Sequence, residues 1–302
     1  MEENKMGTQP MLGLIAKMSL PAMFSMLIQS LYNVVDSIFV AQIGENALTA
    51  VSLAYPVQTL MIAFGVGTGV GLNSLISRRL GEKRIDDATD AANHGAILGV
   101  ATWILFALLG IFFTETFFRF YTSDPTIFQM GCDYTYVVTI FSIGVFVEIN
   151  NERTLQATGN MIYPMVFQLI GAVANIILDP IFIFGWLGIP AMGVKGAAIA
   201  TVAGQILAMI YSTYILQCKD HAVKVSFKNF KFKWGIVGEI YKVGFPSIVM
   251  QAIASVLIVG LNAILTVFSS TAVAVLGVYY KLQSFVFMPV FGLNNGLMPI
   301  MG

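Results

Sequence analysis

Two carboxylates inside long apolar stretches are the residues of this sequence best placed to do chemistry. Asp36 and Asp179 each lie in a run of apolar residues long enough to cross a bilayer as a helix. A carboxylate at membrane depth costs about 2.5–3.5 kcal/mol on insertion scales, so such residues face a protein interior or a polar cavity and serve a function. We therefore expect both acids to belong to a polar site.

Other polar residues accompany the two acids at helical spacing. On the first apolar stretch, positions three or four residues apart put several polar side chains on one helix face: Ser25, Gln29, Tyr32, Asn33 and Asp36. The stretch around Asp179 carries a similar polar stripe: Gln168, Asn175 and Asp179. Because such faces are unfavourable against lipid, we expect both helices to turn them toward the protein interior.

The two acids and Thr201 are predicted to lie at similar depth. Asp36 and Asp179 come a turn or two before the outer ends of their helices, and Thr201 about two turns after the outer start of its own. Carboxylate, amide and hydroxyl oxygens are hard ligands of the kind that Na+ accepts, and two acids held together favour binding of a proton. The sequence predicts a site for a coupling ion, H+ or Na+, with no other cofactor. Its expected members are Asp36, Asn175, Asp179 and Thr201.

Two prolines are predicted to act as hinges in the helices that carry the acids. Pro180 directly follows Asp179, and Pro21 lies near the inner end of the first span. Proline removes a backbone hydrogen bond and bends a helix. We expect bending to couple the charge of Asp36 or Asp179 to the shape of the cavity. In the alternative interpretation, the acids only cap or pair with neighbouring helices.

A third acidic residue, Glu148, is interpreted as structural. It lies near the inner end of its span, close in sequence to Glu152 and Arg153. A local ion pair at the membrane interface is the expected role.

The composition identifies the class of protein that positions these residues. The chain of 302 residues is 57% hydrophobic and 11% charged, with a mean hydropathy of +0.80, whereas a soluble domain is about one quarter charged. The apolar runs are long and continuous rather than alternating, which predicts helices. The expected fold is all-α and polytopic in a membrane. The net charge of zero and the lack of a separate basic domain argue against a nucleic-acid partner.

The apolar runs predict eight spans and an orientation. The spans are expected over residues 14–40, 52–77, 91–113, 133–156, 161–186, 194–217, 236–267 and 273–300. With alternating sides, most Lys and Arg fall on the side of the N-terminus, against Arg119 and Lys195 on the other. The positive-inside rule then predicts a multi-pass protein of the cell membrane with a cytoplasmic N-terminus.

An internal repeat divides the chain. Shifting the sequence by 225 positions aligns Ile15–Pro21 with Ile240–Pro246 without a gap, and the match continues through Tyr55 with Tyr280 and other pairs. A helical unit followed by its copy is typical of transporters that handle substrate between two halves. We predict a six-helix lobe over 1–217, a cytoplasmic linker over 218–235 and the first two helices of a second lobe over 236–302. About four further spans are expected to be missing.

The combination of motifs resembles the multidrug and toxic compound extrusion (MATE) family. The segments Leu155–Pro164 and Asn175–Pro180 are similar to family motifs, and Asp36 stands where the family carries an essential acid. The resemblance implies export of diverse, often cationic, organic compounds in exchange for H+ or Na+, by alternating access between two six-helix lobes. It also implies that the four residues named above bind the coupling ion. No acid occurs from Gly244 to Gly302, which favours this site over one in the second lobe.

Small-molecule drugs or organic cations and the lipid bilayer are the expected partners, and no obligate protein partner is evident. The predicted substrate cavity is lined by polar residues near the acids: Gln29, Tyr32, Asn33, Tyr134 and Gln168. The resemblance supports Tyr32 and Tyr134 in this role.

Three alternatives stay open at the level of sequence. A lipid-linked oligosaccharide flippase of the same superfamily shares the repeat, but it should line its cavity with several Arg and Lys, which the first six spans nearly lack. A membrane-embedded enzyme such as a prenyltransferase needs clustered acids with Mg2+ at the cytoplasmic side, whereas Asp36 and Asp179 lie toward the outside. No phosphate-binding loop, zinc motif or nucleophile elbow is present, so an enzyme is not expected. The third alternative is an inactive fragment.

Overall fold

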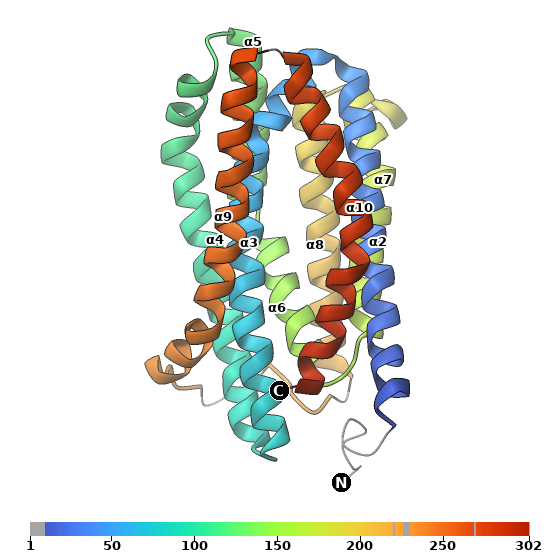
Figure 1. Ribbon diagram of the computed structural model, residues 1–302, viewed down its shortest axis with the longest axis vertical. Coiled ribbons are helices and arrows are strands. Elements are labelled where there is room, and N and C mark those ends of the chain that lie inside the picture. Colours follow the sequence, from blue (N-terminus) through green and yellow to red (C-terminus); the bar gives the residue numbers. More distant parts are fainter. Residues whose placement is uncertain (1–9, 220, 226–229, 269, 302) are drawn as a thin grey trace.

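The computed structural model describes residues 10–219, 221–225, 230–268 and 270–301, and all regular secondary structure among them is helical (Figure 1). The helices are α2 (Met11–Ile43), α3 (Glu45–Gly81), α4 (Ile85–Tyr121), α5 (Pro125–Ile140), α6 (Ile143–Ala157), α7 (Ile162–Phe184), the short η1 (Trp186–Gly188), α8 (Val194–Cys218), α9 (Trp234–Phe268) and α10 (Ser270–Met301). They run roughly along one axis and form a bundle (Figure 1). The prediction of an all-α membrane fold is confirmed.

Most of the predicted spans correspond to helices long and apolar enough to cross a membrane. Within the described residues six helices meet this requirement, namely α2, α3, α4, α7, α8 and the Trp234–Ile258 part of α9. The pair α5 and α6 meets it only when taken together, which raises the number to seven. The eighth predicted span, 273–300, lies inside α10.

The fourth predicted span is not one helix. The sequence predicts a continuous helix over 133–156, but α5 and α6 meet at a bend of 44°. Trp103 of α4 donates its indole N–H to the carbonyl of Ile140 at 2.8 Å, and the Ser142 hydroxyl donates to the carbonyl of Thr139 at 2.7 Å. These side chains satisfy carbonyls that are left without helical partners at the end of α5. The predicted span over 133–156 is therefore formed by two helices that meet at a bend.

One end of the bundle is rich in basic residues, and we call it the basic end. It carries the α3–α4 turn and the start of α9, at the bottom of Figure 1. Its described basic residues include Arg78, Arg79, Lys83, Arg84 and Lys233. Arg78 and Arg79 both pair with Glu239 of α9, at 2.9 and 3.0 Å.

The segment before α9 docks on α4 at this end. Lys233 donates its ammonium to Asp90 at 2.6 Å, and this hydrogen bond raises the pKa of Lys233. Its backbone N–H donates to His94 Nε2 at 2.8 Å. The predicted linker 218–235 includes residues 220 and 226–229, which lie outside the described residues, and the division into lobes stays a prediction.

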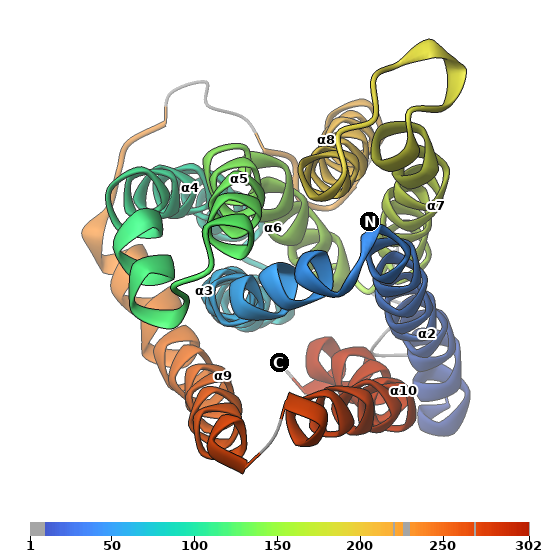
Figure 2. The same cartoon turned by 90° about the horizontal axis from the view of Figure 1, so that it is seen from above.

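The helices follow the same shift as the sequence. α2 and α3 of the first copy correspond to α9 and α10, which lie on either side of residue 269, a position outside the described residues. The packing is reciprocal, because α9 lies against α3 while α10 lies against α2 (Figure 2). The first helix of each copy thus packs on the second helix of the other.

Glycines make this reciprocal packing close. A Cβ at Gly71 of α3 would overlap the carbonyl of Ile240 in α9. The matching position in the second copy, Gly296 of α10, would place a Cβ 2.6 Å from the Ser19 hydroxyl of α2. Small residues of this kind let membrane helices approach closely, so both contacts depend on the missing side chain.

A valine at Gly71 should loosen the contact between α3 and α9. We expect Gly71→Val to lower the thermal unfolding temperature of the purified protein, because no side chain fits against the Ile240 carbonyl. Gly260→Val is the matched control, since a Cβ at Gly260 of α9 meets nothing within 4 Å. Equal melting of the two variants would contradict the packing described.

Candidate functional site

Asp179, Asn175 and Thr201 form a buried polar cluster between α7 and α8, which we call the Asp179 cluster. Their exposed fractions are 0%, 2% and 5%. The Asn175 amide is best satisfied with its nitrogen donating to Asp179 Oδ2 at 2.8 Å and its oxygen accepting from the Thr201 hydroxyl at 3.3 Å. The buried Asp179 carboxylate therefore accepts a hydrogen bond from the Asn175 amide. Thr201 of α8 in turn donates to the oxygen of that amide.

Close packing of α7 and α8 makes this cluster possible. A Cβ at Gly204 of α8 would lie 2.7 Å from the carbonyl oxygen of Gly171 in α7 and 3.5 Å from the Asn175 Cβ. A Cβ at Gly196 would overlap the Phe182 carbonyl. Because glycine occupies both positions, the two helices approach closely enough for Asn175 to reach Thr201.

α2 brings the second acid to the cluster. It packs against α7 and holds Asp36 within electrostatic range of Asp179. Tyr32, one turn before Asp36, lies within hydrogen-bonding range of Thr201 and interacts with both acids. The structure thus gathers all four predicted ion-binding residues and Tyr32 from three helices.

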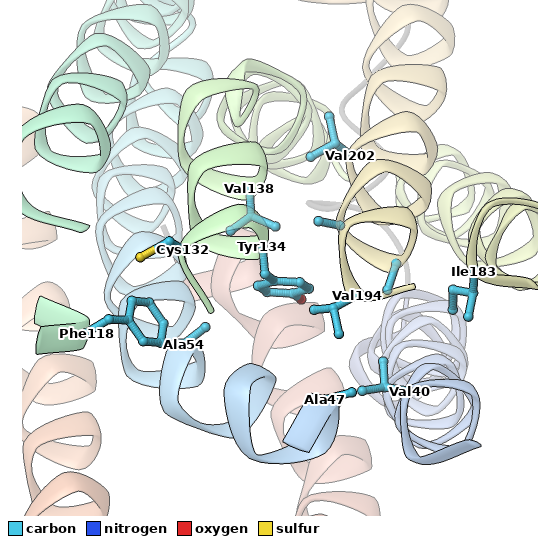
Figure 3. Close-up of a cluster of buried hydrophobic side chains, with 12 residues drawn as sticks. Val40, Ala47, Ala54, Phe118, Cys132, Tyr134, Val138, Ile183, Val194 and Val202 are labelled. Carbon is cyan, nitrogen blue, oxygen red and sulfur yellow. The ribbon is translucent and has the colours of Figure 1, made fainter. Parts of the chain in front are cut away.

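Tyr134 joins the cluster from α5. Its ring is buried in an apolar shell that includes Ala54 of α3 and Val194 and Val202 of α8 (Figure 3). Its hydroxyl accepts a hydrogen bond from the Gln58 amide of α3 at 2.9 Å, and it interacts electrostatically with Asp36 and Asp179. Gln58 was missed as a site residue, although an amide inside an apolar span that recurs as Gln283 in the repeat was a usable signal.

The other predicted cavity residues do not join the Asp179 cluster. Gln168 shares a face of α7 with Asn175, but seven residues separate them, which is about 10 Å along a helix. Its amide donates instead to Glu152 of α6 at 3.2 Å. Asn33 is exposed, and Gln29 is half-buried with no hydrogen bond among the described residues. The role of these three residues in a substrate cavity stays a prediction.

The expected interfacial ion pair of Glu148 is absent from the described part of the chain. Glu148, Glu152 and Arg153 are all buried, and no salt bridge joins them there. Arg153 follows Glu152 directly, so it points about 100° away around the helix and meets other partners. It donates to Gln156 and to Asn295 of α10, each at 3.1 Å. The predicted ion pair was wrong.

The two predicted hinge prolines lie inside helices that continue through them. α2 contains Pro21 and α7 contains Pro180. The Ser25 hydroxyl donates to the Pro21 carbonyl at 3.0 Å. Pro180 has no N–H to donate to the carbonyl of Ile176, so the helix lacks one hydrogen bond within a turn of Asp179. Bending at these prolines stays a prediction.

The geometry of the Asp179 cluster suits a small cation. Two carboxylates, an amide oxygen and hydroxyl groups converge from α2, α7 and α8. The members on α7 and α8 are buried, and Asp36 and Tyr32 of α2 are half-buried. Like charges in such a setting repel each other unless a proton or metal cation compensates them. Na+ at Asp36, Asn175, Asp179 and Thr201, or a proton on one of the acids, remains the predicted occupant.

Comparisons with known proteins agree on one family. The family model described as MatE matches residues 21–181, more than half of the chain. The chain is 28% identical to the FAD transporter of Shewanella oneidensis, covering 94% of this chain and 63% of that protein. It is 25% identical to multidrug export protein MepA of Staphylococcus haemolyticus, covering 93% and 62%.

Solved structures agree with the sequence comparison. One is described as the outward-facing conformation of a multidrug resistance MATE family transporter, and it matches with a TM-score of 0.91 at 27% identity. The match covers 99% of this chain and 66% of that one. The chain thus spans less than two thirds of the length of these relatives.

Asn175 should be needed for stability because it is the described donor to Asp179. We expect Asn175→Leu to lower the free energy of unfolding by about 2–3 kcal/mol, since it leaves a buried carboxylate without its hydrogen bond. Asn33→Leu is the matched control, because Asn33 is exposed on α2. Chemical denaturation in detergent measures both variants, and equal losses would contradict the role of Asn175.

Proposed function

The chain belongs to the MatE family of membrane transporters, and from that premise we propose that it is a secondary active exporter. It moves organic, often cationic, compounds across the membrane in exchange for H+ or Na+. The observation that carries this proposal is the convergence of the half-buried Asp36 and the fully buried Asp179 in one polar cluster.

The two acids supply a way to couple an ion to helix movement. Asp36 is on α2 and Asp179 on α7, so without a cation their charges push these two helices apart. A bound proton or Na+ removes the repulsion and lets the helices close on each other. The ion therefore favours one arrangement of α2 against α7, which is the differential binding that a conformational change requires.

Movement of α2 would also move the second copy of the repeat. α2 packs closely against α10, and α3 packs in the same way against α9. A shift of α2 relative to α7 therefore also changes how α10 sits on the bundle. This supports alternating access between the two halves, with the substrate held between them.

The chemistry of the cluster favours cations as substrates. One relative is described as a FAD transporter and another as a multidrug export protein. FAD carries a pyrophosphate, which the two carboxylates would repel. The same repulsion counts against the pyrophosphate head group of a lipid-linked oligosaccharide. We propose that Tyr32 lines the substrate cavity, where its aromatic ring also attracts organic cations. Tyr134 is buried among apolar side chains, and its place in the cavity lining stays a prediction.

The distribution of charge supports an orientation. Arg78, Arg79, Arg84 and Lys233 gather at the basic end. By the positive-inside rule we propose that this end faces the cytoplasm and that the protein resides in the cell membrane.

Removing either acid should abolish coupled export. In cells expressing the gene, we expect Asp36→Asn and Asp179→Asn each to reduce efflux of a fluorescent organic cation by about tenfold or more, because the coupling ion loses a charged ligand. Asp86→Asn serves as the control, since Asp86 is exposed in the first turn of α4.

The amount of each variant in the membrane is measured alongside efflux. Near-normal efflux in both site variants, at equal membrane levels, would refute the proposed function.

The native cysteines test the orientation. Cys218 is exposed at the end of α8 and Cys132 is buried in α5. We expect a membrane-impermeant maleimide to label the protein only after the cells are permeabilised, and Cys218→Ser to remove this labelling. Labelling of Cys218 in intact cells would place the basic end outside.

A further inference from the structure

A second polar cluster lies on α6, in the half of the bundle nearer the basic end (Figure 1). We call it the Glu148 cluster, and it consists of Glu148, Glu152, Arg153, Gln156 and Gln168. Its two acids and its arginine are buried, with exposed fractions of 9%, 4% and 4%. Charged side chains are almost never buried to this degree unless they are paired or functional.

Glu152 is the member of the cluster that is built to carry a negative charge. Its Oε1 accepts a hydrogen bond from the Gln156 amide at 2.6 Å, and its Oε2 accepts one from the Gln168 amide of α7 at 3.2 Å. Amide donors on both oxygens stabilise a carboxylate. Arg153 brings one formal positive charge to the same cluster, although no salt bridge joins it to Glu152 in the described part of the chain.

Glu148 lacks this support. Its Oε1 is buried and has no hydrogen-bond partner among the described residues. Glu152 and Arg153, both on α6, are the charged groups that act on Glu148. The helices packed against α6, which are α3, α4, α7, α8 and α10, bring no further described charge to it.

The charge balance of the cluster identifies what Glu148 binds. With Glu152 ionised and Arg153 positive, the cluster is neutral, and an ionised Glu148 would leave an uncompensated negative charge in a dry interior. A metal cation would need several oxygen ligands, yet both oxygens of Glu152 already accept amide hydrogens. A single proton on Glu148 restores neutrality without any other ligand.

We propose that Glu148 is a second proton-binding site, which exchanges a proton with the aqueous phase at the basic end. The step is transfer of one proton from water to a carboxylate oxygen. Binding of this proton does not depend on the Asp179 cluster, and only a role of the proton in export rests on the proposed function. The polar stripe of α7 connects the two clusters, because Gln168 contacts Glu152 while Asn175 contacts Asp179.

Protonation of Glu148 would also affect the contact with the second copy of the repeat. Arg153 interacts electrostatically with Glu148, and its guanidinium donates to Asn295 of α10 at 3.1 Å. Loss of the proton would draw Arg153 toward the new negative charge and weaken its hold on Asn295. The contact between α6 and α10 would then respond to the protonation of Glu148.

Infrared spectroscopy of the purified chain in lipid nanodiscs tests the proposal without relying on transport. A buried protonated carboxylic acid gives a carbonyl band that shifts in D2O. We expect this band near neutral pH in the unmodified protein and in the Asp36→Asn/Asp179→Asn variant, from which the acids of the Asp179 cluster are absent. Adding Glu148→Gln to the Asp36→Asn/Asp179→Asn variant should remove the band. The surface control Glu82→Gln should retain it, because Glu82 is exposed and ion-paired.

Two outcomes would overturn the proposal: no band in the Asp36→Asn/Asp179→Asn variant, or a band that persists when Glu148→Gln is added to that variant. Glu148→Asp guards against a folding defect, because it should restore a band at a shifted frequency. Failure of this proposal and failure of the proposed function can be told apart. Unimpaired efflux in the Asp36 and Asp179 variants would refute the proposed function, whereas the infrared band alone decides the proposal on Glu148.

Discussion

A carboxylate buried in a membrane bundle must be compensated, and the arrangement around Asp179 follows from that constraint. Asp179 is fully buried and receives its hydrogen bond from Asn175, which is held in turn by Thr201. This chain of contacts requires α7 and α8 to lie very close, and glycines such as Gly204 make that distance accessible. The Asp179 cluster thus depends on the close packing of the α7 and α8 backbones.

The same packing principle joins the two copies of the repeat. Gly71 of α3 against α9 and Gly296 of α10 against α2 are equivalent positions in two related contacts. α2 carries Asp36 and also packs against α10, so one helix connects the Asp179 cluster with the second copy of the repeat.

The Asp179 cluster and the Glu148 cluster lie at two different depths of the bundle. Each contains two acids, but the compensation differs. The Asp179 cluster has amide and hydroxyl partners, whereas the Glu148 cluster contains an arginine and two amides. The Glu148 cluster contacts the second copy of the repeat through Asn295, whereas the Asp179 cluster is connected to it only by α2, which packs against α10. The bundle interior is therefore polar at both levels.

The sequence by itself determined the class of fold, the approximate spans, the repeat and the gathering of Asp36, Asn175, Asp179 and Thr201. These features depend on hydropathy, helical period and depth, which are local properties of a chain. Only the tertiary structure decided the bend between α5 and α6, the partner of Gln168, the role of Gln58 and the separation of Arg153 from the acids. Each of these depends on a contact from another helix, such as Trp103 with the Ile140 carbonyl or Arg153 with Asn295. Helical period predicts which face a residue occupies, but the rotation and distance of the neighbouring helix determine what that face meets.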